Sequence, residues 1–160
     1  MHVEPTAEHR WLLQWVGNWT VEATSPGAEG EAPSTQRGTE TVSTIGDLWI
    51  VAKGEGEMPG GGRAITQLAL GFDPEAGKFR GTWVGSMMTH HWVYEGTLDP
   101  ATNTLNLDAE GPDFFTGTGT CVYRDAYQWV DDNTRVLRSM VRQADGTWGE
   151  PFMTATYRRA

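Results

Sequence analysis

The chain has 160 residues, a length that fits one domain, here residues 1–160, burying about 70% of its unfolded surface around one core. Acidic residues outnumber basic residues 21 to 12, for a net charge of −9. This charge would repel a phosphate backbone or an anionic membrane surface over most approaches, which argues against nucleic acid and membranes as partners.

The first expected element is a short amphipathic helix within the N-terminal segment, residues 1–15. The spacing places Trp11, Leu12 and Trp15 on one helical face, and this apolar face needs a surface to cover. A helix that leads directly into a first strand is well placed to cap one end of a β-barrel and to bury its tryptophans there.

Beyond this helix, polar and apolar residues alternate with the period of two that is typical of β-strands. Turn sequences rich in Asp, Pro, Gly and Asn separate the alternating segments, as at 73–77 and 99–103. The pattern predicts about ten strands, at residues 17–24, 36–45, 47–56, 64–72, 78–85, 89–98, 104–109, 119–130, 134–143 and 152–159.

Consecutive hairpins imply an up-and-down antiparallel meander, and closing such a meander removes both of its edges. We therefore predict an all-β fold, an antiparallel up-and-down β-barrel of about ten strands with a short N-terminal helix. Residues 25–34 are too rich in Gly, Pro, Ala and Glu for a strand and are expected to form a flexible loop. The glycine triplet within 58–63 is expected to be another loop, because no helix pattern follows it.

The first predicted strand begins with Gly17-Asn18-Trp19. This triplet resembles the Gly-x-Trp signature of the lipocalin and calycin superfamily, in which the Trp packs at the barrel floor under an Arg from the last strand. The resemblance implies the same role for Trp19, with Arg158 as the preferred partner and Arg159 as the alternative. Either guanidinium would stack on the indole in a cation–π contact.

Motifs along nearly the whole chain resemble a bacterial family of uncharacterised proteins, domain of unknown function fifteen-seventy-nine. Those motifs are Gly17-x-Trp19, Gly71-Phe72-Asp73, Trp83-x-x-Ser86-Met87, Asp145-Gly146 and Tyr157-Arg158-Arg159. Gly85 stands where the family pattern has Asp, and the two closing arginines leave the partner of Trp19 open. The family has no assigned activity, so the resemblance implies a lipocalin-like barrel and no reaction.

Two sequence features, the cysteine content and the start of the chain, bear on cellular location. The single cysteine, Cys121, cannot form an internal disulfide, and the start of the chain has no basic region followed by an apolar stretch of secretory length. No apolar run approaches the ~20 residues of a membrane-spanning helix. We expect a soluble cytoplasmic protein, with export by a route lacking a visible signal as the alternative.

Motifs of the common enzyme classes are absent: there is no nucleophile elbow, metalloprotease helix, dinucleotide fingerprint or Walker loop. Cys121 is interpreted as a small buried hydrophobic residue. Glu95 and Asp125 would form a carboxylate pair if neighbouring strands brought them together, although surface carboxylates are the ordinary case in an acidic protein. An enzyme is therefore an alternative to a binding protein.

Adjacent histidines, His90 and His91, fall in a predicted strand and would point to opposite faces. They cannot chelate one metal as a pair, and no other cluster has ligand spacing, so no metal or cofactor is predicted. A haem held by one of these histidines is an alternative, set against a role in a packed wall.

Large side chains dominate the predicted lumen, because the chain has eight Trp, four Tyr, five Phe and six Met. The residues expected to line it are Trp83, Met87, His90, Trp92, Tyr94, Tyr123, Tyr127, Trp129, Met140 and Met153. His90 and the tyrosine hydroxyls would orient an otherwise apolar guest. Three late arginines, Arg124, Arg138 and Arg142, are expected on a solvated outer face; the alternative is that one of them points inward and pairs with a guest that carries a carboxylate.

These residues lead to the prediction that the protein binds a small hydrophobic or amphipathic molecule in the barrel lumen. Three alternatives stay open. One is an enzyme acting on a small molecule in the same cavity, and another is a haem-binding barrel. The third is a module with a filled lumen that acts as a homodimer through an exposed sheet face.

Overall fold

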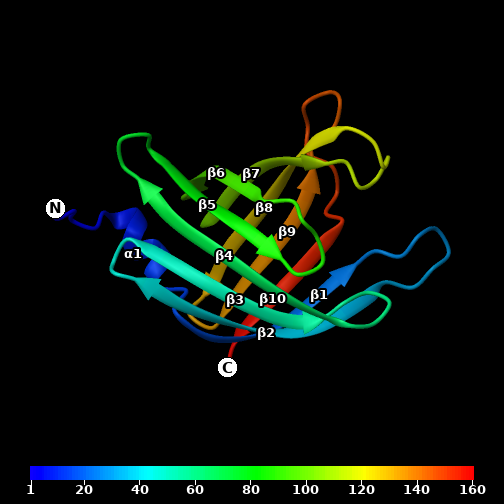
Figure 1. Ribbon diagram of the computed structural model, residues 1–160, viewed down its shortest axis with the longest axis horizontal. Coiled ribbons are helices and arrows are strands. Elements are labelled where there is room, and N and C mark those ends of the chain that lie inside the picture. Colours follow the sequence, from blue (N-terminus) through cyan, green and yellow to red (C-terminus); the bar gives the residue numbers. More distant parts are fainter.

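One helix and ten antiparallel strands make up the fold in the computed structural model, which describes residues 1–160 (Figure 1). The elements are α1 (Ala7–Leu13), β1 (Gly17–Ser25), β2 (Ser34–Ile45), β3 (Trp49–Glu57), β4 (Arg63–Asp73), β5 (Lys78–Gly85), β6 (Trp92–Asp99), β7 (Thr104–Pro112), β8 (Thr120–Asp131), β9 (Thr134–Val141) and β10 (Met153–Arg159). No helix has the length and apolar character needed to cross a membrane.

Each strand pairs with the next along the chain, and β10 returns to pair with β1, so the sheet forms a closed barrel. The predicted antiparallel barrel is confirmed, and most strand boundaries agree within a few residues. The predicted strand 89–98 is the main exception, because β6 begins only at Trp92. His90 and His91 therefore belong to the connection that follows β5.

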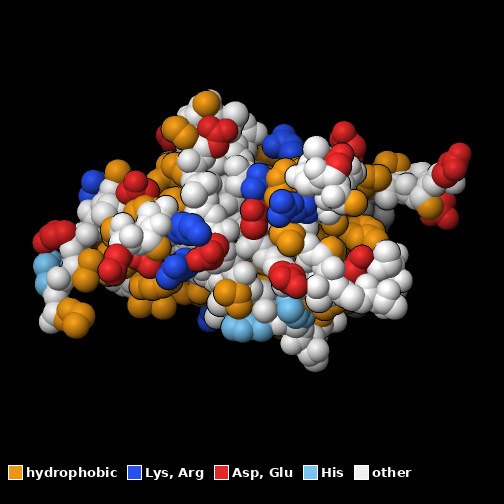
Figure 2. All heavy atoms as spheres, turned by 90° about the horizontal axis from the view of Figure 1, so that it is seen from above, with side chains coloured by type: hydrophobic (Ala, Val, Ile, Leu, Met, Phe, Trp, Pro, Cys, Tyr) orange, Lys and Arg blue, Asp and Glu red, His pale blue; other side chains and the backbone are white.

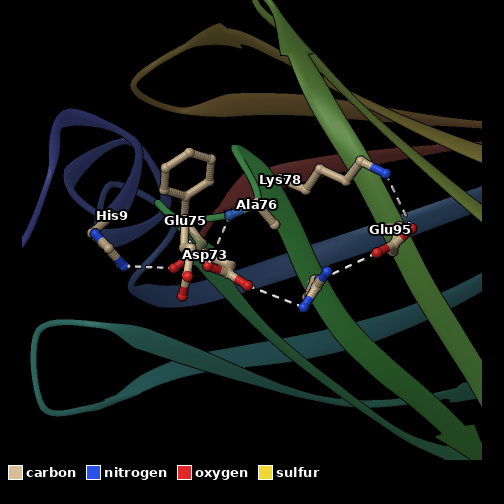
Figure 3. Close-up of polar contacts among 8 residues, drawn as sticks. His9, Asp73, Glu75, Ala76, Lys78 and Glu95 are labelled. Atoms are coloured by element: carbon tan, nitrogen blue, oxygen red, sulfur yellow. Dashed lines mark hydrogen bonds and ion pairs between the residues drawn. The ribbon is translucent and has the colours of Figure 1, made fainter.

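Two hairpin turns follow the chemistry that predicted them. The Asp73 carboxylate accepts hydrogen bonds from the backbone N–H groups of Glu75 (3.0 Å) and Ala76 (3.2 Å), and Gly77 closes the turn with φ of 64° (Figure 3). Asn103 takes φ of 53° in the equivalent β6–β7 turn. A positive φ suits Gly and Asn, so these residues fix the two turns.

Helix α1 lies at one end of the barrel, which we call the floor (Figure 1). The Nδ1 atom of His9 accepts a hydrogen bond from the backbone N–H of Thr6 (2.9 Å), and its Nε2 donates to the Phe72 carbonyl on β4 (3.0 Å; Figure 3). Trp11 Nε1 donates to the side-chain oxygen of Asn103 (2.8 Å). These contacts attach the helix to two separate hairpins of the barrel.

Aromatic side chains fill the floor half of the lumen. Trp15 and Trp19 are almost completely buried. The Trp15 ring lies 5.0 Å from the Tyr127 ring, and the Trp19 ring meets the Trp129 ring edge to face at 5.9 Å. Because this half is packed, open space inside the barrel lies toward the other end.

Candidate functional site

The floor is closed by arginine stacking on Trp19. Arg159 lies over the Trp19 ring at 4.2 Å and donates to the backbone carbonyls of Val16 (2.8 Å) and Gln14 (3.0 Å). The preference for Arg158 was wrong. Trp19 is paired with Arg159 across β1 and β10, so their side chains share the inner face. Arg158, one residue earlier on β10, is exposed on the outer face.

Gly17 is required by the same contact. A Cβ atom at this position would lie 2.7 Å from Nη1 of Arg159, and its φ of 137° disfavours residues with a side chain. The Gly-x-Trp signature therefore supplies both the indole and the space for the guanidinium that covers it.

A second arginine, Arg135, stacks on Trp19 from inside the barrel and was missed by the sequence analysis. Its side chain is only 1% exposed, and its guanidinium carbon lies 4.6 Å from the Trp19 ring and 4.1 Å from the Tyr157 ring. Arg135 also pairs with the Glu40 carboxylate. Burial raises the pKa of Glu40, and the positive charge of Arg135 opposes that shift.

A cavity of about 490 Å³, which we call the mouth cavity, opens at the end of the barrel away from α1. Ten of its twelve lining residues are hydrophobic. The lining residues are Trp83, Met87, Met88, Trp92, Tyr94, Phe114, Phe115, Tyr123, Asp125, Ser139, Phe152 and Met153. The cavity therefore combines an apolar wall with a small polar base.

Six of the ten residues expected in the lumen wall line this cavity: Trp83, Met87, Trp92, Tyr94, Tyr123 and Met153. Tyr127 and Trp129 point into the lumen but belong to the packed floor half. Met140 does not point inward, because its neighbour Ser139 is the buried residue and successive strand residues alternate between faces.

His90 stands at the rim and not in the cavity wall. Its ring meets the Trp92 ring edge to face at 4.6 Å, and its Nε2 lies 3.2 Å from the Glu110 carbonyl oxygen. Neither His90 nor His91 lines the mouth cavity, so no imidazole in the cavity wall could bind a haem iron. No three His, Cys, Asp or Glu side chains gather at metal-binding distance.

Three phenylalanines of the rim were also missed. Phe114 and Phe115 belong to the β7–β8 connection, and they are 57% and 62% exposed. Phe152 precedes β10 and meets the Phe115 ring at 5.3 Å. These rings lie in or beside connections between strands, where strand alternation gives no signal.

The polar base of the cavity is the Asp125 carboxylate. It accepts hydrogen bonds from the Ser139 hydroxyl (2.5 Å) and from the Tyr94 hydroxyl. Burial raises the pKa of Asp125, and these two hydrogen bonds oppose the shift. Asp125 was detectable in the sequence, because it stands midway between Tyr123 and Tyr127 on the inward face of its strand.

Glu95 does not pair with Asp125 as the sequence allowed. Glu95 points outward from β6 and forms ion pairs with Arg80 (3.2 Å) and Lys78 (3.4 Å; Figure 3). Basic and acidic side chains likewise lie side by side on the outer face in Figure 2. Arg124 pairs there with Asp108 at 2.7 Å, on the outer face as predicted.

Polar contacts also hold the rim in place. The Tyr123 hydroxyl donates to the Pro112 carbonyl at the end of β7 (2.6 Å) and accepts a hydrogen bond from the backbone N–H of Phe114 (3.3 Å), which ties the connection carrying Phe114 to β8. Burial raises the pKa of Tyr123 to about 12, and the neighbouring half-buried Cys121 thiol adds to the shift. Tyr123 is therefore a neutral hydrogen-bond donor near neutral pH.

The segment Trp83–Met87, which carries one of the family motifs, forms another part of the rim. Trp83 and Met87 line the cavity. Between them, the Ser86 hydroxyl accepts a hydrogen bond from the backbone N–H of Ile65 (2.9 Å) and fixes the segment to β4. This motif therefore lies at the cavity and not at the floor.

Two solved structures are similar to the barrel at low sequence identity. The S-type phycobiliprotein lyase CPES from Guillardia theta has a TM-score of 0.64 at 12% identity, covering 97% of this chain and 93% of its own. Rv2717c from M. tuberculosis has a TM-score of 0.67 at 11% identity, covering 98% and 99% respectively. These likenesses show a lipocalin-like fold.

No curated protein matches the chain. A family profile with the description "Protein of unknown function (DUF1579)" matches residues 4–159, which is nearly the full length. The family suggested by the sequence motifs is thus found independently, and the chain belongs to the DUF1579 family.

Proposed function

We propose that the protein binds a small, largely apolar molecule in the mouth cavity. The observation that carries this proposal is the cavity itself, with a volume of about 490 Å³ and ten hydrophobic residues among twelve. Sites for small molecules usually enclose ~300–1,000 Å³ and combine apolar walls with a few polar groups.

The lining suits a flat or flexible apolar guest. Trp92 and Tyr123 stand edge to face with 5.0 Å between ring centroids, which makes a firm aromatic wall. Met87, Met88 and Met153 border the same space. Their unbranched side chains adapt to guests of different outline.

A second hollow, beside Glu40 and Tyr157, has a volume of only about 150 Å³. This volume is below the usual range for a ligand site, so the mouth cavity is the better candidate. Catalysis in the mouth cavity would depend on Asp125, the one lining carboxylate. Asp125 is hydrogen-bonded to the Ser139 and Tyr94 hydroxyls, but no His, Lys, Cys or second carboxylate lines the cavity to complete an acid–base pair, an arrangement that favours binding over catalysis.

The proposal can be tested with N-phenyl-1-naphthylamine, a neutral dye that fluoresces in apolar surroundings. We expect the wild-type protein to bind it with micromolar affinity. Met87→Asp, which puts a charge at the rim, should weaken binding about tenfold, because an unpaired charge is costly beside an apolar guest. Met140→Asp is the matched control, since this methionine faces outward.

Absence of dye binding to the wild type would overturn the proposal. The same conclusion would follow if Met87→Asp bound the dye as well as the wild type does, or if Met140→Asp lost binding while remaining folded by circular dichroism.

A further inference from the structure

We propose that the mouth cavity selects guests that carry a protonated amine or a similar cationic hydrogen-bond donor, and that Asp125 receives this group. This inference rests on the proposed binding function and adds the chemical class of the guest. It is carried by the hydrogen bonding of Asp125 and by the absence of any basic side chain from the cavity wall.

Hydrogen bonding at the cavity base leaves acceptors free. An ionised carboxylate offers about four acceptor positions on its two oxygens. Asp125 uses one oxygen for the Ser139 hydroxyl and the other for the Tyr94 hydroxyl. Because Asp125 lines the cavity, its remaining acceptor positions can receive hydrogen bonds from a guest.

The charge of Asp125 has no partner within the protein. The lining of the mouth cavity contains no Lys, Arg or His. The adjacent Arg124 points to the outer face and is paired with Asp108. A buried carboxylate without a cation is costly, and a cationic guest would reduce that cost.

The contrast with Glu40 supports this reading. The barrel interior holds two partly buried carboxylates, and Glu40 is supplied with its own cation, Arg135, enclosed by aromatic rings. Asp125 is the carboxylate that borders the cavity, and the protein supplies no cation there. Arg135 supplies the positive charge beside Glu40 at the floor. At the mouth, a guest would have to supply the positive charge beside Asp125.

The aromatic wall is consistent with a positively charged guest. Trp92, Tyr94 and Tyr123 line the same space as Asp125, and aromatic faces attract ammonium groups, most strongly when water is excluded. A carboxylate guest would instead face the Asp125 charge with no basic group to receive it. The cavity should therefore discriminate against fatty acids and other anions.

Three probes with one ring system test this charge preference: 1-naphthylmethylamine, 1-naphthalenemethanol and 1-naphthoic acid. Their affinities for the wild type can be measured at neutral pH by titration calorimetry and by displacement of N-phenyl-1-naphthylamine. We expect the amine to bind at least tenfold more tightly than the alcohol, and the acid to bind most weakly.

Asp125→Asn keeps the shape of the side chain and removes its charge. This variant should bind the amine and the alcohol within about twofold of each other. Glu95→Gln is the matched control, because Glu95 follows Tyr94 on β6 but faces outward; it should keep the wild-type preference. Circular dichroism checks that both variants are folded.

The two proposals fail in different ways. If the alcohol or the acid binds the wild type as tightly as the amine does, the charge preference is overturned and the binding function stands. If the wild type does not bind the dye, the binding function is overturned and this inference falls with it. The wild-type ranking decides the question even if Asp125→Asn does not fold.

Discussion

The two ends of the barrel use similar side chains in opposite ways. At the floor, Trp19 is 1% exposed and lies between Arg159 and Arg135, and the buried charge of Arg135 is paired with Glu40. At the mouth, aromatic rings border open space, and the Asp125 carboxylate has hydrogen-bond donors but no cation.

The difference shows how a closed sheet can separate stability from binding. Because β10 pairs with β1, no strand of the barrel has a free edge that other parts of the chain would need to cover. The floor contacts join β1, β9, β10 and the segment that follows α1 through three residues, Trp19, Arg135 and Arg159. Substitutions at the floor should therefore change stability, whereas substitutions at the mouth should mainly change binding.

The largest effect is expected for Trp19→Ala. Removing a buried Trp typically costs ~3–5 kcal/mol, and Trp19 additionally loses two arginine contacts and the hydrogen bond to the Trp15 carbonyl (2.8 Å). Urea unfolding measures the change. The control is Trp49→Ala, at a Trp that is 44% exposed. If Trp19→Ala costs no more than this control, the floor is not the stabilising end.

Arg135→Met should cause the next largest loss of unfolding free energy, about 3 kcal/mol, because it leaves the Glu40 carboxylate inside the barrel without its cation. Arg138→Met, on the same strand, is the control, because Arg138 is exposed and its guanidinium donates a hydrogen bond to Gln128 (3.1 Å) and pairs with no carboxylate. A double-mutant cycle with Glu40→Gln should give a coupling energy of ~0.5–3 kcal/mol. Additive losses would contradict the pairing.

The fold was predictable because its signals are local. Turn residues such as Asp73 and Asn103 form the hydrogen bonds and take the positive φ that their chemistry favours. The choice between Arg158 and Arg159 depended instead on pairing between β1 and β10. These strands lie far apart in the sequence, so a one-residue shift of register decides which arginine covers Trp19.

The candidate site was predictable only in its apolar part. Strand alternation placed Tyr94 and Tyr123 on the wall, but Asp125 was considered only as a partner of Glu95, and Arg135 was not considered. General expectation places charged residues at the surface, and only the pairing of distant strands shows that these two have partners inside. The rings of Phe114 and Phe115 lie in a connection, where no periodicity applies.

The smallest expected effect concerns Asp125→Asn and the pH dependence of stability. Tyr94 from β6 and Ser139 from β9 face Asp125, and Asp108 acts on it from β7. Burial raises the pKa of Asp125 above its ordinary value of 3.8, so the folded state holds this proton to higher pH than the unfolded state does. The stability linked to the proton is complete below the ordinary value and is lost as pH rises through the folded pKa.

The Asn side chain cannot ionise, so the stability of Asp125→Asn relative to the wild type should increase as pH rises through that window. Urea unfolding at a series of pH values measures the difference, and Glu95→Gln, which changes an outward carboxylate, should not reproduce the trend. Adding the naphthylmethylamine probe should reduce the relative gain, because the amine stabilises the ionised wild type. A relative stability that falls with pH would mean that the folded protein already supplies Asp125 with a cation, and the contrast between floor and mouth would then be lost.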